Sequence, residues 1–575
     1  MKRSLVLLPL VIALVLTGCL KEDLRSSTTA ETYFRSSAQV ETGLNGCYVP
    51  LRGIFSARGY WLTTDVDTDV MYIANSSTMY EANCDISPAR PGIAATVWSN
   101  GYLGVMRTNE IISDIRSSVS NGFISDEESE PFIAEAMVLR TLYYYLLTAT
   151  FGDVPYYTEK VTEGNRPSIA SLPRMSADAT RDSCIRDMKY WILAKKVLPM
   201  RRTYDVGYRA GAAVGLMLGA KCAAWNKEWS EVLSFVDALE DIYGKYSDSP
   251  ERFAASYPLT DIPFSQKYVP ESIFECGNAV MSFGIQTSGL IASIATPKRS
   301  LAPTLASEAE EGGDLSEETT EEEGEEDDTG TEAASDYYDG IVIPELGAFA
   351  RTSTSVRPTE YFYQQLEPYF SQDLRSGEYS ASSSVPRGGS GNLAWRWRGY
   401  KASDVDRQNE TVLYFFFGGS KPGSYNSRPW LGNKFWCPGM YNSKDSNNYK
   451  IFRFADALLL KAEAFLGLGK YDAACDYLNI TRVRANMDRV TFAGVNGNPE
   501  ALMEEIRRER ARELFGEFQR KYDLVRWGIW YERTRAYNTN RFLQDYIRPC
   551  HEYWPIPQDQ VSYSGNALDN AAYAY

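Results

Sequence analysis

The clearest hydrophobic pattern in this chain begins at Ile451. From there apolar side chains recur mostly three or four residues apart, which places them on one face of an α-helix. The apolar positions are Ile451, Phe454, Ala455, Leu458, Leu459, Ala462, Phe465 and Leu466. A turn at Gly467 to Asp472 and a second helical segment, Ala473 to Arg484, follow. The pattern therefore predicts a helix hairpin.

Helical periodicity also marks other parts of the chain. The expected helices are Val97 to Arg116, Ile133 to Leu147, Arg209 to Ala224, a segment from there through Leu239, and Glu500 to Phe518. The second of these runs into Gly152 and Asp153, which suit a turn, and Pro155, which stops a helix. The region 209–239 reads as a second hairpin with small residues at its crossing. We therefore predict a mainly α fold.

The later hairpin carries the residue types of a tetratricopeptide repeat. Such a repeat has a small residue, a turn glycine, an aromatic residue and an alanine at set positions. Here these positions hold Ala464, Gly469, Tyr471 and Ala474. The two hairpins lie far apart in the sequence, so we expect an interrupted, tetratricopeptide-like helical scaffold.

The region from roughly Asp261 to Tyr449 lacks helical periodicity. Gly, Ser, Pro and aromatic residues dominate it, with short extended pieces such as Val412 to Phe417. This composition predicts a loop-rich portion with short strands. Loops held on a rigid scaffold commonly carry binding sites. We therefore expect the ligand-binding portion here.

An acidic stretch, 307–336, lies inside this region. It holds 15 Asp and Glu and no Lys or Arg, which accounts for nearly all of the net charge of -16. Few large apolar residues and strong self-repulsion predict a disordered, solvated insertion, whose spacing matches no calcium loop. The rest of the chain is close to neutral. No basic patch stands out, which argues against a nucleic-acid partner.

The N-terminus reads as a secretory signal. Lys2 and Arg3 precede the apolar run Ser4 to Leu16, which is too short to span a bilayer. Thr17, Gly18 and Cys19 follow this run directly, and Gly18-Cys19 looks like the lipobox of a bacterial lipoprotein. We expect residues 1–18 to be removed and Cys19 to carry a lipid anchor. The charged residues at 21–23 resemble an acidic signal for export to the outer surface of the outer membrane.

Cysteine and histidine usage narrows the possible chemistry. The nine cysteines include no CxxC pair, so we predict no zinc site and no other metal site. Cys222 and Cys475 fall in apolar helical stretches and are expected to be buried thiols. His551 is the single histidine of the chain, which leaves little room for histidine-based catalysis. A glycosidase-type pair of carboxylates stays open.

Aromatic residues outside the helical pattern are the candidates for ligand contact. Aromatic faces suit sugar rings, and amides and charged groups suit hydroxyls. The candidate clusters are Trp61, Tyr72, Asn75 and Tyr80; Trp395, Arg396, Trp397 and Tyr400; and the pair Tyr337 and Tyr338. For each aromatic residue, burial under a loop is the competing interpretation. Asp65, Asp67 and Asp69 lie beside the first cluster and read as a polar edge of a binding loop rather than a calcium site.

Several motifs in a fixed order resemble the SusD/RagB family of outer-membrane nutrient-binding lipoproteins from Bacteroidetes. They are Gly18-Cys19, Leu44 to Tyr48, Arg140 to Tyr143 with Phe151 to Pro155, Arg209 to Trp225, Glu271 to Glu275, Tyr449 to Arg484, Ile506 to Arg510, Tyr522 to Gly528 and Tyr553 to Pro557. The resemblance covers nearly the whole chain after the signal. The acidic insertion departs from the family pattern and leaves the alignment of the 280–350 loops open.

This resemblance implies a single SusD-like domain over residues 19–575. It implies a partner, a SusC-like TonB-dependent transporter, on which the lipoprotein sits as a lid at the outer membrane. It implies binding of an oligosaccharide without catalysis or cofactor. Peptide capture by the same family, a surface glycoside hydrolase, and a helical scaffold with no small-molecule site are the alternatives.

Overall fold

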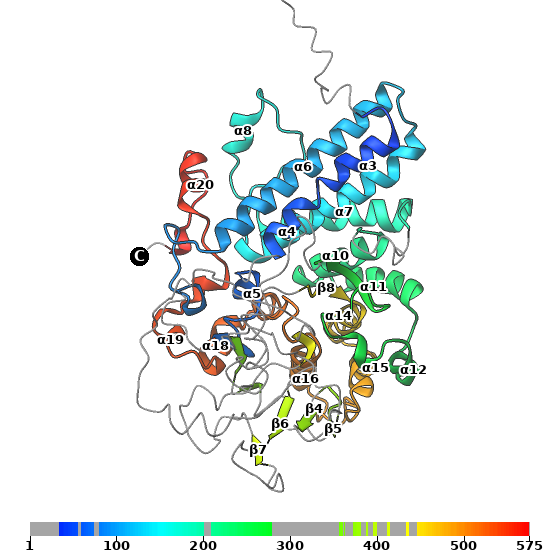
Figure 1. Ribbon diagram of the computed structural model, residues 1–575, viewed down its shortest axis with the longest axis vertical. Coiled ribbons are helices and arrows are strands. Elements are labelled where there is room, and N and C mark those ends of the chain that lie inside the picture. Colours follow the sequence, from blue (N-terminus) through cyan, green and yellow to red (C-terminus); the bar gives the residue numbers. More distant parts are fainter. Residues whose placement is uncertain are drawn as a thin grey trace, which may run out of the picture.

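The computed structural model describes two long N-terminal stretches, the C-terminal part and several short pieces between them. The described residues are 34–55, 59–73, 80–199, 209–278, 356–359, 361–362, 372–375, 377–380, 387–388, 395–399, 411–413, 433–435 and 446–573. The expected signal peptide, Cys19 and the acidic stretch lie outside them. As predicted, the described part of the chain is mainly helical (Figure 1).

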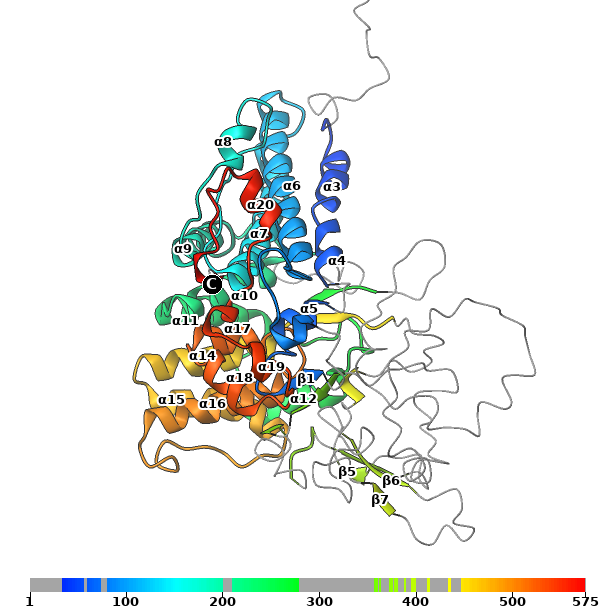
Figure 2. The same ribbon diagram turned by 90° about the vertical axis from the view of Figure 1, so that its left-hand side faces the viewer.

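The two longest helices pack against each other side by side. They are α6 (Ala94–Ser120) and α7 (Asp126–Phe151), and α3 (Ser37–Asn45) and α4 (Val49–Phe55) lie along them (Figure 2). Both predicted helices are thus confirmed, and each is longer than its apolar pattern. Ser125 begins α7 with a capping box, in which its hydroxyl accepts from the Glu128 N–H.

The region after α7 includes the hairpin predicted at 209–239. The region contains α8 (Arg166–Ala170), α9 (Ala177–Met188), the π-helical turn η2 (Lys189–Lys195), α10 (Ala212–Trp225) and α11 (Trp229–Tyr243). The hairpin forms from the last two helices, α10 and α11. The predicted small-residue crossing is confirmed, because a Cβ at Gly219 would lie 2.5 Å from the Phe235 ring. Only glycine lets α10 and α11 approach so closely.

The second hairpin, α14 (Phe454–Gly467) and α15 (Tyr471–Arg484), also forms as predicted, but its first helix starts later. Residues Ile451 to Arg453 belong to strand β8 (Tyr449–Arg453), which pairs with β2 (Ser272–Cys276). Local periodicity cannot reveal this, because the strand is held by hydrogen bonds to a distant segment.

The helix expected over Glu500 to Phe518 is shorter than predicted. Helix α16 (Pro499–Glu513) ends at a turn in which Gly516 and Phe518 have φ of 70° and 60°. The turn directs Phe518 into the aromatic core, where its ring lies 6.0 Å from that of Trp61. Tertiary packing therefore overrides the four-residue spacing.

The remaining helices are short and mostly C-terminal. They are α5 (Gly59–Thr64), η1 (Tyr80–Asn83), α12 (Pro250–Ser256), η4 (Leu259–Asp261), η12 (Asn433–Phe435), α17 (Arg520–Arg526), α18 (Trp530–Tyr537), α19 (Leu543–Tyr546), η13 (Pro549–Glu552), α20 (Gln558–Tyr563) and η14 (Ala571–Tyr573).

The strands form three small sheets. Strand β1 (Met71–Ile73) pairs antiparallel with β3 (Val356–Pro358), and β2 pairs with β8. The third sheet has the order β5-β4-β6-β7, built from β5 (Arg387–Gly388), β4 (Gly377–Ser380), β6 (Trp395–Gly399) and β7 (Thr411–Leu413). In Figure 2 this sheet lies on the opposite side of the molecule from α9 and α11. A strand is thus confirmed at the start of Val412 to Phe417; residues 414–417 lie outside the described part.

The helical scaffold and the C-terminal helices share one apolar core. Cys222 and Cys475 lie in it as buried thiols, as predicted, and Trp98 and Trp225 are buried as well. Among the described residues, no helix combines the length and the apolar character needed to cross a membrane.

Candidate functional site

Two of the aromatic candidates belong to the core. Trp61 and Tyr72 are each 1% exposed. The Trp61 ring meets the Phe435 ring edge-on at 5.3 Å between centroids, and Tyr72 lies within β1 opposite Arg357. The expectation of a ligand platform from these two rings is therefore not met. Large aromatic side chains stabilise a core as readily as a binding site, and only packing distinguishes the two.

Tyr80 lies in η1 and is half-buried. The Arg90 guanidinium lies 3.7 Å above its ring centroid, and Arg90 also pairs with Asp85 at 2.7 Å. One face of the ring is thus already stacked by a cation. Tyr80 stays a candidate for ligand contact, with Arg90 as its neighbour.

The second cluster lies in the small sheet of the loop-rich portion. Trp395, Arg396 and Trp397 are consecutive in β6, an inner strand between β4 and β7. Trp395 and Trp397 occupy alternate positions, which in a strand belong to one face. Tyr400, Asn75, Tyr337 and Tyr338 lie outside the described residues.

The carboxylates at 65, 67 and 69 are a correction to the sequence analysis. All three are buried rather than lining a loop edge. Asp67 pairs with Lys521 at 2.6 Å, and Asp69 accepts from Arg520 at 2.6 and 2.8 Å and from Arg533 at 3.1 Å. These ion pairs fasten the segment after α5 to α17 and α18. They leave no carboxylate array for calcium.

Burial and the nearby cations set the pKa values of these carboxyl groups. Burial raises the pKa of Asp65 to about 7, against a partial lowering by the Thr64 hydroxyl, which donates to it at 2.8 Å. Burial also acts on Asp69, but Arg520 and Arg533 outweigh it and hold its pKa below the ordinary value. The pKa values of Asp65 and Asp69 thus shift in opposite directions, because only Asp69 has guanidinium partners.

A second buried ionic cluster joins the loop-rich portion to the helices. Arg375 binds Asp373, Glu509 and Glu513, all at 3.1 Å or less. Glu513 also meets Arg453 at 2.9 Å and Arg484 at 2.5 Å. Although burial alone would raise the pKa of Glu513, these arginines lower it well below its usual range.

This cluster continues through β8 and the segment before β2. Arg453 reaches Glu271 at 2.8 Å and Glu517 at 2.7 Å, and Glu517 meets Lys434 at 2.5 Å. Arg453 and its partners Glu517 and Glu271 lie 64 and 182 positions apart in the chain. Among the described residues, Glu271, Arg375, Lys434 and Arg453 are therefore held by ion pairs to α15, to α16 and to the turn after α16.

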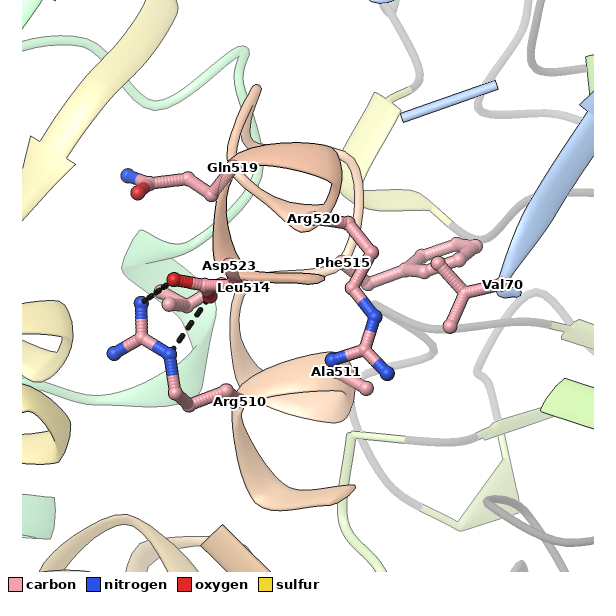
Figure 3. A pocket seen from close by; sticks show the side chains of 8 residues that line it. All are labelled: Val70, Arg510, Ala511, Leu514, Phe515, Gln519, Arg520 and Asp523. Carbon is pink, nitrogen blue, oxygen red and sulfur yellow. Dashed lines mark hydrogen bonds and ion pairs between the residues drawn. The ribbon is translucent and has the colours of Figure 1, made fainter. Parts of the chain in front are cut away.

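A third cluster surrounds a small cavity between α16 and α17 (Figure 3). Arg510 turns toward Asp523, which it meets at 2.8 Å, while Arg520, Phe515 and Val70 lie on the other side. The cavity measures about 10 Å³, room for at most a single water. This site is structural, not a place for a ligand.

The single histidine does not form a catalytic pair. His551 is buried, and burial together with Arg548 and Lys521 lowers its pKa to about 3. Its Nδ1 accepts from the Arg548 backbone N–H at 3.2 Å. The ring is therefore neutral at physiological pH. Within the described ranges, no group of His, Cys, Asp or Glu side chains could hold a metal ion.

The apolar pattern of the sequence does not reveal these charged residues. Arg453 and Asp456 lie at the start of an apolar helical face, and charge there is a signal of buried ion pairs. The sequence does not reveal a polar cleft of about 320 Å³, either. Gly152, Asp153 and Tyr553 line this cleft, but in the sequence they appear only as parts of family motifs.

Two family profiles match the chain. One, described as "SusD family", matches residues 351–573. The other, described as "Starch-binding associating with outer membrane", matches residues 21–216.

Among curated proteins, the chain is 24% identical to SusD-like protein P25 of Formosa agariphila, over 96% of this chain and 95% of that protein. It is 22% identical to SusD-like protein P2 of the same organism, over 90% and 89%.

Solved structures share the fold. A SusD homolog from Bacteroides thetaiotaomicron matches with a TM-score of 0.63 and 20% identity, covering 94% of this chain and 99% of that one. Surface glycan-binding protein A from B. thetaiotaomicron in complex with laminarihexaose matches with a TM-score of 0.62 and 19% identity, covering 92% and 98%. The fold, the two profiles and the curated relatives agree, and the chain belongs to the SusD/RagB family.

Proposed function

We propose that this protein is a surface lipoprotein of the outer membrane that captures an oligosaccharide and passes it to a SusC-like TonB-dependent transporter. The observation that carries the proposal is family membership together with a relative of the same fold that was solved with laminarihexaose. The protein binds its ligand without changing it and needs no cofactor.

The ligand site lies on the loop-rich portion, at β6. Trp395 and Trp397 offer aromatic faces to a sugar ring, and Arg396 and Tyr400, their neighbours in the sequence, supply polar contacts. Asn75 and Tyr80 stay a separate candidate contact. The buried ionic clusters support this assignment, since they hold the neighbouring segments to the helices. A rigid mount reduces the entropy lost when a flexible glycan binds.

Cys19 anchors the protein by lipid, and the partner is a transporter barrel in the same membrane. The charged residues after Cys19 direct the protein to the cell surface. Co-purification of a TonB-dependent barrel with the tagged, lipidated chain tests this partner; recovery without any such barrel contradicts it.

The binding experiment uses a glycan array followed by calorimetry with the glycan that scores highest. We expect the double variant W395A/W397A to weaken binding about tenfold or more, because each lost aromatic stack is worth on the order of 1 kcal/mol. Y563A, at a tyrosine that is 78% exposed on α20, is the control and should bind normally.

Three outcomes would redirect the proposal. Unchanged affinity of the double variant removes β6 from the site. Binding of peptides but no glycans favours the peptide-binding alternative. Release of reducing ends from polysaccharide by the purified protein favours a glycoside hydrolase.

A further inference from the structure

A polar cleft of about 320 Å³ opens between the end of α7 and the start of α9. Its size is at the lower end of the range for small-molecule sites. It is lined by Gly152, Asp153, Arg174, Ser176, Ala177, Asp178, Arg181 and Tyr553. In Figure 2, α9 and β6 lie on opposite sides of the molecule, so this cleft is separate from the β6 site.

The cleft is built by a short backbone bridge. Val154 and Met175 exchange backbone hydrogen bonds, which brings the end of α7 beside the start of α9. The Asp153 carboxylate accepts from the Ala177 N–H at 2.8 Å. Gly152 has φ of 70°, and a Cβ there would lie 3.4 Å from the Tyr553 ring. The positive φ favours glycine at this turn, and the Tyr553 ring packs against it.

Arg181 supplies a buried donor without an acceptor. Its side chain is 3% exposed, and its guanidinium lies 4.2 Å over the Trp225 ring. Nη1 donates to Asp178 at 3.1 Å and Nη2 to the Thr148 carbonyl at 3.3 Å, but Nε has no hydrogen-bond partner among the described residues. The Tyr553 side chain, which lines the same cleft, also interacts with Arg181. An acceptor from a molecule bound in the cleft would complete the pairing of Nε.

The charges of the cleft select the ligand class. Two cationic and two anionic side chains line the cleft, namely Arg174, Arg181, Asp153 and Asp178. The Arg174 guanidinium donates to the backbone carbonyls of Phe151, Asp153 and Asp569, so the open donor is on Arg181. An anionic ligand would be repelled by the carboxylates, and a cationic ligand would be repelled by the guanidinium groups. A neutral polyhydroxyl molecule can donate to the carboxylates and accept from Arg181, and the Tyr553 ring, which also lines the cleft, can contact its C–H groups.

We propose that this cleft is a second saccharide site, which takes a single neutral sugar unit. The inference goes beyond the capture of a transported glycan at β6 and does not rest on it. Such a site on the helical scaffold would hold a neighbouring part of a long glycan, or a separate chain, away from the loop-rich portion. Two weak sites on one molecule raise the effective concentration of a polymeric ligand.

The test uses the full, processed protein in detergent, titrated with methyl glucoside, methyl galactoside and N-acetylglucosamine. Tryptophan fluorescence follows binding, because Trp225 touches Arg181. We expect a saturable change with at least one of these sugars in the W395A/W397A background, where the β6 tryptophans cannot contribute, and its absence when W225F is added. R181Q and Y553L should weaken binding about tenfold, the effect of losing one charge-assisted hydrogen bond or one aromatic contact.

Two controls distinguish binding in this cleft from a general effect of lost charge and from binding at β6. R186Q makes the same charge change at an exposed position of α9 and should bind like the wild type. W395A/W397A should also keep the response, even if glycan capture at β6 is lost. If R181Q does not fold, Y553L decides, since Tyr553 is only half-buried.

The proposal is overturned by wild-type binding in folded Y553L, by loss of the response in W395A/W397A, or by no saturable response to any of the three sugars. Tighter binding of glucuronate or of lysine than of the neutral sugars would also overturn it, because it would contradict the balance of charges.

Discussion

Buried charged side chains dominate this protein at the residue scale. Asp69, Glu513 and Asp523 are each enclosed by arginines. The Arg520 partner of Asp69 lies 451 residues away, whereas Asp523 pairs with the nearer Arg510 and Arg526. A buried ion must be paired, because an isolated charge in the interior is strongly unfavourable. These residues therefore act together, and single substitutions should have large effects.

Replacing Asp69 by Asn should destabilise the fold by about 3–5 kcal/mol, because Arg520 and Arg533 would stay buried without a counter-charge. The measurement is urea unfolding followed by circular dichroism. The matched control is D85N, at the exposed pair with Arg90, which should change the free energy of unfolding by less than about 1 kcal/mol. Equal effects would show that Asp69 is not held as described.

Asp65 should make stability fall as pH rises. Its pKa is raised from 3.8 to about 7 in the folded state, so between those values the folded protein binds more protons than the unfolded chain. Its contribution is therefore most favourable below about pH 4 and is lost by about pH 7, a change of at most about 4 kcal/mol. D65N should flatten the dependence of unfolding free energy on pH in this window.

Glu513 and Asp523 should make stability rise with pH, which is the opposite of the effect of Asp65. Their pKa values are lowered by arginines, so their stabilisation is present above the unfolded pKa and is lost as the pH falls through the folded values. In both the wild type and D65N, acid should therefore unfold the protein as Glu513 and Asp523 become protonated. A D65N protein whose stability still declines between about pH 4 and 7 as in the wild type would contradict the assignment to Asp65.

At the scale of elements, close helix crossings decide the architecture. The α6–α7 pair is possible because Gly101 and Gly104 face Leu147 and Tyr143, whose side chains occupy the space of a Cβ. Gly104 to Ala should therefore cost about 1–3 kcal/mol through overpacking, despite the better helix propensity of alanine. S117A, at an exposed position of the same helix, should be neutral in thermal unfolding. Equal melting temperatures for the two variants would contradict this crossing.

The helices were largely predictable, whereas the strands and most site residues were not. The faces of α6, α7, α10 and α14 repeat with the helical period, so sequence alone located them. Strand β8 and the turn after α16 depend on long-range partners. Trp61 and Trp395 look alike in sequence, yet one packs on Phe435 in the core and the other lies in a sheet of the loop-rich portion.

At the scale of the whole molecule, a helical body carries a loop-rich portion, and the proposed lipid anchor precedes both. Replacing Cys19 by Ser should abolish incorporation of labelled palmitate and move the protein from the membrane fraction to the soluble fraction. The folded body should be unaffected, because the described fold begins at residue 34. C550S, at a partly buried thiol of the body, is the control and should stay in the membrane fraction.

Labelling of C19S at the wild-type level would place the anchor elsewhere. Loss of labelling without release from the membrane fraction would show that the partner barrel holds the protein by itself.

The order of short motifs and the helical period were sufficient to predict the family and the mainly α class. These are local properties, since a period or a motif lies within one stretch of chain. The tertiary structure alone decided which charges and aromatic rings are buried. Asp67 and Lys521 are 454 residues apart and form a contact only in the folded chain. The cleft beside Arg181 likewise exists only because the end of α7, the start of α9 and the C-terminal segment with Tyr553 meet there.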